Sequence, residues 1–188
     1  MVGRGRPRDA GVEARVLDAA MTEMRANGYD GLSVDRVAER AGVAKTTLYR
    51  RWSSKAELVM AMISELTSGV RFDPSGEPRR DLTEFVAGIA AALDAIPTTL
   101  VADLVAAAAR EPRVGEGVRA LWAERHAVVA AAITRAQADG LMPAHADPRV
   151  IVDQLVGALY YRLLITGEPI DPAYVRALVL STLGPEQS

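Results

Sequence analysis

The chain has 188 residues, of which 49% are apolar, so it can bury a sizeable core as one domain or two small ones. It has no cysteine, which excludes disulfides and thiolate chemistry. It also has no apolar run of roughly 18 residues and no signal-peptide hydrophobic region, so we expect a cytoplasmic protein without a membrane partner. The 22 basic and 24 acidic residues nearly balance, but residues 1–60 hold 11 basic and 8 acidic residues, so positive charge is concentrated near the start.

Residues 1–9 are predicted to be a flexible basic arm. Its cations are Arg4, Arg6 and Arg8, with no acid before Asp9. The sequence Arg-Gly-Arg-Pro within it resembles an AT-hook, in which arginines enter the narrow minor groove of A·T-rich DNA. The alternative is a basic tail that stays in solvent.

Helical periodicity then continues almost to the end of the chain, and no stretch alternates as a half-buried strand does. The pattern predicts a helix over 12–27, stopped by Gly28, and a second after the N-cap Ser33, stopped by Gly42. A third short helix covers "KTTLYRRW", residues 45–52. A fourth begins at the capping box of Ser54 and Glu57 and runs to about residue 70.

The second and third helices have the spacing of a helix-turn-helix, whose second helix enters the DNA major groove. At 100° per residue, Leu48 and Trp52 share the inner face, while Thr46 and Arg50 point outward toward base edges. Five basic residues and no acid lie from Arg40 to Lys55, which is typical of phosphate binding, although a charge run by itself is often only a solvated face.

The stretch "GLSVDRVAERAGVAKTTLYRRWSSKAELV", together with the preceding "ANGYD", resembles the DNA-binding domain of the TetR family of transcriptional regulators. The resemblance implies a DNA-binding domain over 10–56, a regulatory and dimerisation domain over 57–188, and a homodimer. It implies DNA contacts from Ser33, Lys45, Thr46, Thr47, Tyr49, Arg51 and Lys55. Helical geometry adds Arg50. Ala44 stands where the family commonly has serine, so the third helix loses a capping hydroxyl.

A linker is predicted around 72–81, because Pro74, Gly76 and Pro78 fall in one short window. Beyond it the pattern predicts helices near 82–95, 99–110, 114–139, 148–166 and 172–183, the last two preceded by Asp-Pro caps. The fold class is therefore all-α, with about nine helices. The stretch 146–171 is similar to the C-terminal regulatory domains of one TetR branch.

The helix over 148–166 is apolar almost all round, which indicates cover on more than one side and favours a dimer over a central helix of a monomer. The predicted interface residues are Val152, Leu155, Gly157, Ala158, Leu159, Val175, Leu178, Val179 and Thr182. Polar or aromatic residues on otherwise apolar helices are candidates for binding a small-molecule effector, namely Asp103, Trp122, His126 and Tyr161.

The sequence contains no recognisable catalytic triad or metal-ligand spacing, so no catalytic residue, metal or cofactor is predicted. We therefore expect a ligand-responsive repressor that binds a palindromic DNA operator. An activator of the same family, and a small-molecule-binding protein or enzyme with a structural helix-turn-helix, are the alternatives.

Overall fold

The computed structural model describes residues 8–142, 144 and 146–184. Within that part of the chain the structure is helical and has no strand, which confirms the predicted all-α class. The described residues group into two compact units, the first formed by those within 1–66 and 99–118 and the second by those within 67–98 and 119–188.

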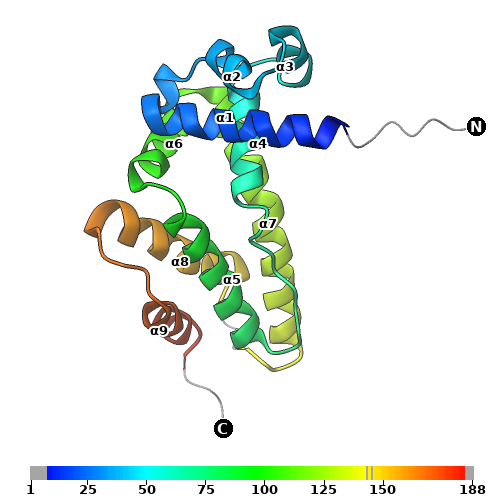
Figure 1. The fold of residues 1–188 in the computed structure, drawn as a ribbon. Helices are drawn as coiled ribbons and strands as arrows, with labels where there is room; N and C mark the ends of the chain where they lie inside the picture. Colours follow the sequence, from blue (N-terminus) through cyan, green and yellow to red (C-terminus); the bar gives the residue numbers. More distant parts are fainter. Residues whose placement is uncertain (1–7, 143, 145, 185–188) are drawn as a thin grey trace, which may run out of the picture. The chain divides into compact units, whose positions relative to one another are not determined.

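The first unit begins with the long helix α1 (Arg8–Gly31), on which α2 (Val34–Ala41), α3 (Lys45–Arg51) and α4 (Lys55–Leu66) are arranged. Figure 1 shows α2 and α3 together on one side of α1, and α4 leaves from the other. α6 (Thr98–Arg110) and the start of α7 (Pro112–Ala138) complete this unit. Its core includes the buried side chains Val16, Met24, Val37 and Leu48.

Local signals set both ends of α2 as predicted and the start of α4 nearly so. The Ser33 hydroxyl accepts a hydrogen bond from the backbone N–H of Arg36, and Gly42 ends α2 in a left-handed conformation with φ of 66°. No side chain caps α3 at Ala44. Ser54 caps α4 by accepting from the N–H of Glu57, whose carboxylate accepts from the N–H and hydroxyl of Ser53, one residue earlier than the predicted box.

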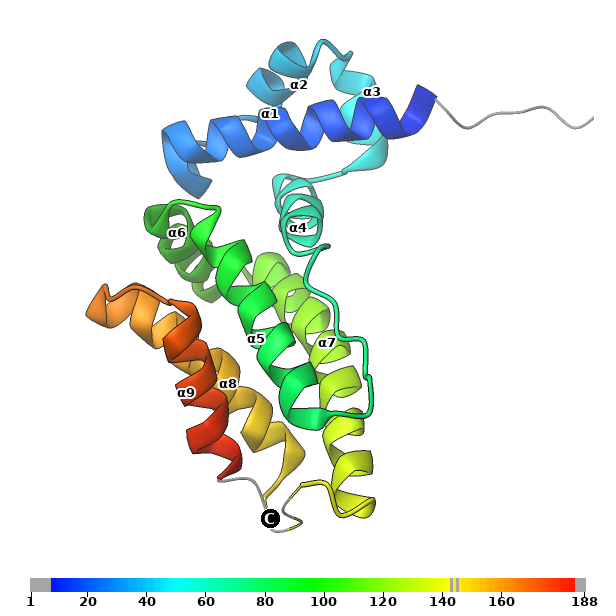
Figure 2. The ribbon, with the colours of Figure 1, turned by 60° about the horizontal axis from the view of Figure 1, so that its bottom comes forward.

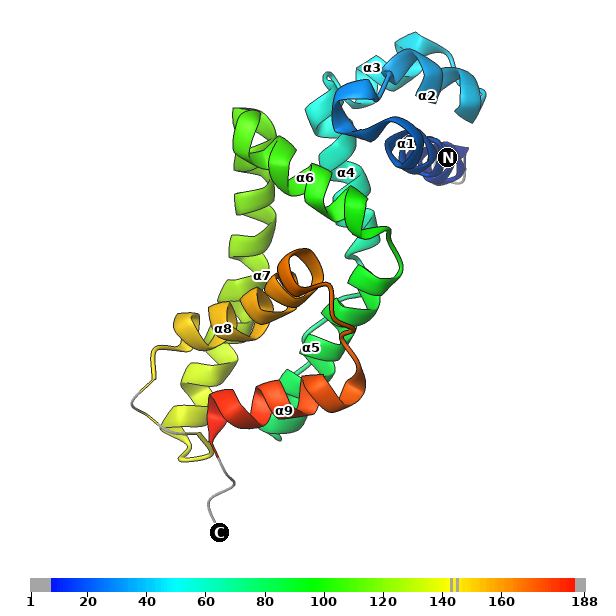
Figure 3. The ribbon, with the colours of Figure 1, turned by 90° about the vertical axis from the view of Figure 1, so that its left-hand side faces the viewer.

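The second unit contains α5 (Pro78–Asp94), most of α7, α8 (Pro148–Tyr161), a π-helical turn over Arg162–Thr166, and α9 (Pro172–Leu183). Figures 2 and 3 show α9 beside α5, with α8 next to both. Asp147 and Asp171 cap α8 and α9 as predicted, each with proline at the start of the helix. The core is formed by leucine, isoleucine, valine and phenylalanine side chains of these helices.

Several boundaries differ from the predictions. α1 begins at Arg8, inside the predicted arm, and α4 ends at Leu66 rather than near 70. α5 starts earlier than predicted because Pro78 suits the first helical position and the buried Asp81 accepts hydrogen bonds from the N–H and hydroxyl of Ser75. The predicted linker is thus partly tied to the helix that follows it.

The division into units also differs from the domain boundary predicted at 56/57. α4 packs on α1, and α6 joins the first unit although it lies beyond the linker in sequence. No single helix in the described ranges is long and apolar enough to cross a membrane, and α5 and α6 reach that length only when taken together across the break between them.

Candidate nucleic-acid interface and effector site

α3 presents one buried face and one polar face, as its sequence predicts. Leu48 is 1% exposed and Trp52, which follows the helix, is 7% exposed. On the outside, the side chains of Lys45, Thr46, Tyr49, Arg50 and Arg51 are exposed, while Thr47 and Lys55 are half-buried. The predicted DNA-contacting residues of α3 therefore gather on its outer face or along its flanks.

Two basic side chains of α3 form ion pairs with acidic residues of neighbouring helices. Lys45 Nζ lies 2.6 Å from Asp35 Oδ2, a hydrogen bond that raises the pKa of Lys45. Arg51 pairs with Glu13 of α1. Exposed pairs of this kind are weak, so a DNA phosphate can replace the carboxylate.

Lys55 is positioned by the turn that follows α1. Its ammonium lies 4.4 Å from the centre of the Tyr29 ring and 3.2 Å from the backbone oxygen of Asp30. Because Lys55 is also half-buried, these two contacts fix the position of its ammonium group beside α3. Of the basic residues on α3, Arg50 alone has no ion pair or hydrogen bond in the described part of the chain.

A buried carboxylate fixes α2 against α1, and the sequence reading missed it. Glu23 is 4% exposed and accepts from Arg36 Nε at 2.8 Å and from Asn27 Nδ2 at 3.1 Å, with Arg40 3.6 Å away. The hydrogen bond from Arg36 holds the pKa of Glu23 below its usual value. The signal available in the sequence was an acid at a position whose neighbours one turn earlier on the helix, Ala19 and Ala20, are apolar.

Asp103, predicted to contact an effector, instead closes a structural contact within the first unit. Gly28 interrupts α1 with φ of 66° and ψ of −176°, and the next backbone N–H, that of Tyr29, donates to the Asp103 carboxylate of α6. Arg110, at the end of α6, pairs with Asp30 at 3.1 Å. These two contacts attach α6 to the turn that also positions Lys55.

The other predicted effector residues do not form one group. Trp122 and His126 lie one turn apart on α7, with ring centres 5.9 Å apart. Tyr161 is 60% exposed at the end of α8, so it lies on the surface of the second unit instead of inside it.

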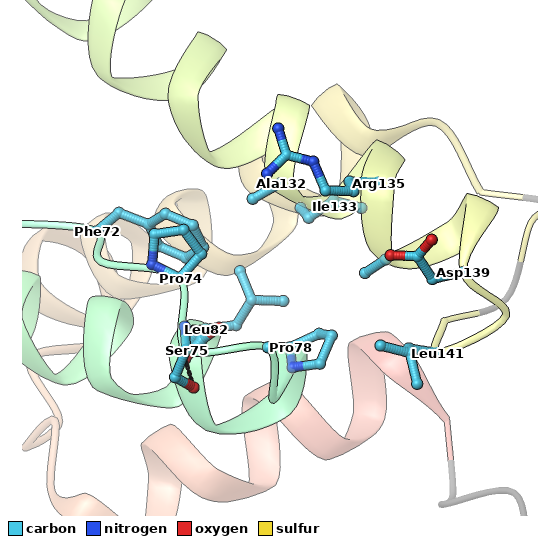
Figure 4. Close-up of a pocket in the computed structure, with 13 residues that line it drawn as sticks. Phe72, Pro74, Ser75, Pro78, Leu82, Ala132, Ile133, Arg135, Asp139 and Leu141 are labelled. Atoms are coloured by element: carbon cyan, nitrogen blue, oxygen red, sulfur yellow. Dashed lines mark hydrogen bonds between the residues drawn. The ribbon is translucent and has the colours of Figure 1, made fainter.

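The second unit has a cavity of about 220 Å³ that none of the four predicted effector residues lines. It lies between the start of α5 with its preceding segment and the end of α7 (Figure 4). Apolar groups dominate its wall, and Arg135 and Asp139 stand at its edge. The apolar residues labelled there are Phe72, Pro74, Pro78, Leu82, Ala132, Ile133 and Leu141.

The structure corrects part of the predicted dimer interface. Five of the nine residues are at most 2% exposed and pack inside the second unit, so they are unavailable to a partner: Val152, Leu155, Leu159, Val175 and Val179. Ala158, Leu178 and Thr182 are half-buried, and Gly157 is exposed. The large apolar side chains exposed on α8, the turn after it and α9 are Val150, Tyr161, Ile165 and Leu180.

The predictions for the arm and for a metal site concern residues that the structure describes only in part. Arg4 and Arg6 of the arm lie outside them, and Arg8 is described only as the first residue of α1. No group of three or more histidine, cysteine or acidic side chains with the arrangement of a metal site occurs among the residues that the structure describes.

Comparison with known proteins agrees with the helix-turn-helix geometry. Residues 16–62 match the family model "Bacterial regulatory proteins, tetR family", and residues 72–181 match "Tetracyclin repressor-like, C-terminal domain". The chain is 31% identical to the HTH-type transcriptional regulator YdeS of Bacillus subtilis over 95% of this chain and 91% of that protein. It is 33% identical to the DNA-binding transcriptional repressor TetR of Mycobacteroides abscessus over 95% and 93%.

A solved structure supports the same relationship. The TetR family transcription regulator SCO0332 is 33% identical, with a TM-score of 0.71 over 93% of this chain and 99% of that chain. The resemblance found in the sequence is therefore confirmed. The names of these relatives point to transcriptional regulators rather than to enzymes.

Proposed function

Because this chain belongs to the TetR family of DNA-binding transcriptional regulators, we propose that it acts as a homodimeric repressor, which leaves its operator when a small-molecule effector binds. The observation that carries the proposal is the outer face of α3. Thr46 and Arg50 are exposed there, opposite the buried Leu48 and Trp52. A free guanidinium and a threonine methyl are suited to guanine and thymine edges in the major groove.

In this proposal the two parts of the chain on either side of the predicted 56/57 boundary have different tasks. Residues 10–56 bind DNA, and residues 57–188 bind the effector and the second subunit, in the cytoplasm. Two copies of α3, about 34–36 Å apart, would enter successive major grooves of a palindromic site. Ser33, Thr47 and Tyr49 would join the basic side chains in contacting phosphates, and the arm arginines Arg4, Arg6 and Arg8 would enter the adjacent minor groove.

The exposed apolar side chains of α8 and α9 support a dimer formed through those helices. Val150, Tyr161, Ile165 and Leu180 are each about half exposed or more, and Gly157 lies on the exposed side of α8. A cluster of exposed large apolar side chains marks a contact with another protein. We take the second copy of this chain as that partner, because a palindromic operator requires two identical DNA-binding units.

Effector binding is proposed in the second unit, either in the cavity at α5 or beside Trp122 and His126. An effector that favours dimers with the wrong spacing of α3 needs a coupling of only about 1–3 kcal/mol to change operator affinity roughly 5- to 150-fold. Its binding should also raise the thermal stability of the protein in proportion to the logarithm of its concentration.

The test is genome-wide mapping of the DNA bound by this protein in cells, followed by a reporter placed behind the recovered site. The proposal expects a palindromic site and higher expression when the gene is deleted. Lower expression after deletion would identify an activator. If no specific site appears, a binding protein or enzyme with a structural helix-turn-helix becomes the better explanation.

A further inference from the structure

The inner face of α7 is apolar toward the end of the helix and carries polar and aromatic side chains before that. Val129 and Ile133 are each 1% exposed on this face, and at 100° per residue Trp122, Arg125 and His126 point to the same side. An apolar inner face is thus continued by an indole, a guanidinium and an imidazole. Both polar side chains lie beside the indole, since the Arg125 carbon Cζ lies 5.5 Å from the centre of the Trp122 ring and the His126 ring centre lies 5.9 Å from it.

Two nitrogens of this group are buried without a partner. Arg125 Nη1 and His126 Nε2 are screened from solvent, and neither has a hydrogen-bond partner among the described residues. Burying an unsatisfied polar group destabilises a protein, and an unpaired cation does so more strongly than a neutral group. Groups that remain unsatisfied in a fold are often reserved for a ligand.

The chemistry of the two nitrogens indicates what they would bind. Arginine can only donate hydrogen bonds, and His126 Nε2 can donate as well, so the matching group is an acceptor. One permanent cation beside an imidazole matches one negative charge better than a doubly charged phosphate. The indole of Trp122 and the apolar side chains beyond it are suited to a flat, apolar body.

We propose that Trp122, Arg125 and His126 form the polar anchor of the effector site and that the effector is an aromatic monocarboxylate. The carboxylate accepts hydrogen bonds from Arg125 and His126, and the ring of the ligand packs against Trp122. This inference rests on the proposed function for the consequence of binding, but not for binding itself.

The experiment uses the full-length protein and a panel of aromatic carboxylates from benzoate to 1-naphthoate, each compared with its uncharged amide by isothermal titration calorimetry. The best carboxylate should bind about tenfold or more tightly than its amide, the factor that one charge-assisted hydrogen bond contributes. Arg125→Met keeps the apolar stem and removes the donors, so it should reduce that ratio to about one. It should also raise the melting temperature of the ligand-free protein, because a buried donor without a hydrogen-bond partner is lost.

Arg135→Met tests the other candidate effector site, since Arg135 is an arginine of the same helix at the edge of the cavity near α5. It should leave the preference for the carboxylate unchanged. The inference is overturned if no carboxylate of the panel binds, if acids and amides bind alike, if Arg135→Met abolishes the preference while Arg125→Met does not, or if Arg125→Met lowers the melting temperature. Binding that follows the expected pattern without release of the operator would instead contradict the ligand-responsive repressor and leave the anchor in place.

Discussion

Arg50 and Lys55 are both basic and both near α3, but their surroundings predict different roles in DNA binding. Arg50 is exposed on the outer face, whereas Lys55 is held at the flank by the Tyr29 ring and the Asp30 carbonyl. Replacing Arg50 by alanine should cost about 1–3 kcal/mol on the operator and relax the preference at one base pair, because it removes a contact to a base edge.

Lys55→Ala is the comparison for that prediction. It should weaken binding to all sequences alike and lower the slope of log affinity against log salt by about one unit, since it removes one phosphate contact. Fluorescence anisotropy with operator and random duplexes at several salt concentrations measures both effects. Equal losses on the two duplexes for Arg50→Ala would mean that the assumed orientation of α3 is wrong.

Glu23 is predicted to stabilise the DNA-binding unit in a pH-dependent way. Its pKa is lowered by the hydrogen bond from Arg36, so its contribution is complete above the ordinary glutamate pKa of about 4.5 and is lost as the pH falls through the lowered value. Glu23→Gln should reduce stability at pH 7 by about 1.5–3 kcal/mol, the contribution of a hydrogen bond to a charged group. Thermal unfolding of both proteins from pH 7 to pH 3 should show the difference shrinking only in acid, and a difference that persists at pH 3 contradicts the assignment.

At the scale of elements, Gly28 determines how α1 ends and how α6 attaches to it. Its backbone angles are reached almost only by glycine, and a Cβ added there would lie 3.0 Å from Asp103 Oδ2. We expect Gly28→Ala to destabilise the protein by about 1–3 kcal/mol and to weaken DNA binding, because the same turn positions Lys55.

Gly11→Ala provides the control for that element. Gly11 lies inside α1 with nothing within 4 Å of an added Cβ, so alanine should be neutral or stabilising by up to about 1 kcal/mol. Urea unfolding and operator-binding measurements on both variants compare their stabilities and their DNA affinities. Equal stability of the two variants would show that the turn tolerates a side chain and that α6 does not depend on it.

At the scale of the whole molecule, the proposed dimer requires a small residue at Gly157 of α8, whereas a single subunit does not. A Cβ added at Gly157 meets nothing within 4 Å, so a large side chain fits in one subunit. Gly157→Trp should therefore give a folded monomer, since it collides only with the partner, and overpacking a tight contact costs about 1–3 kcal/mol or more. Analytical ultracentrifugation with circular dichroism measures assembly and folding together.

Val128→Trp is the control for the dimer, because Val128 is 53% exposed on α7, a helix that is not part of the proposed interface. That variant should remain dimeric and bind the operator normally. If Gly157→Trp is folded and still sediments as a dimer, the subunits associate through another surface.

Features that depend on neighbours in sequence were predictable. Ser33, Asp147 and Asp171 cap their helices as expected, because a cap requires only a side-chain oxygen two or three residues before an unpaired N–H. The orientation of α3 was also predictable, since a period of 3.6 residues places Leu48 and Trp52 on one side regardless of the rest of the fold. The basic outer face of the candidate DNA interface follows directly.

Features that depend on which elements meet were decided only by the tertiary structure. The pairing of Glu23 with Arg36, and of the Tyr29 N–H with Asp103, joins residues 13 and 74 positions apart, and helical periodicity carries no information about such partners. The inner and outer faces of α8 are both apolar, so its sequence could not separate Leu155 and Leu159, which are buried, from Tyr161 and Ile165, which are exposed. By itself the sequence determined the helices, several of their ends and the exposed basic face of α3, because those follow from local hydrogen bonding and periodicity; packing alone decided which apolar face lies inside and which polar groups become buried.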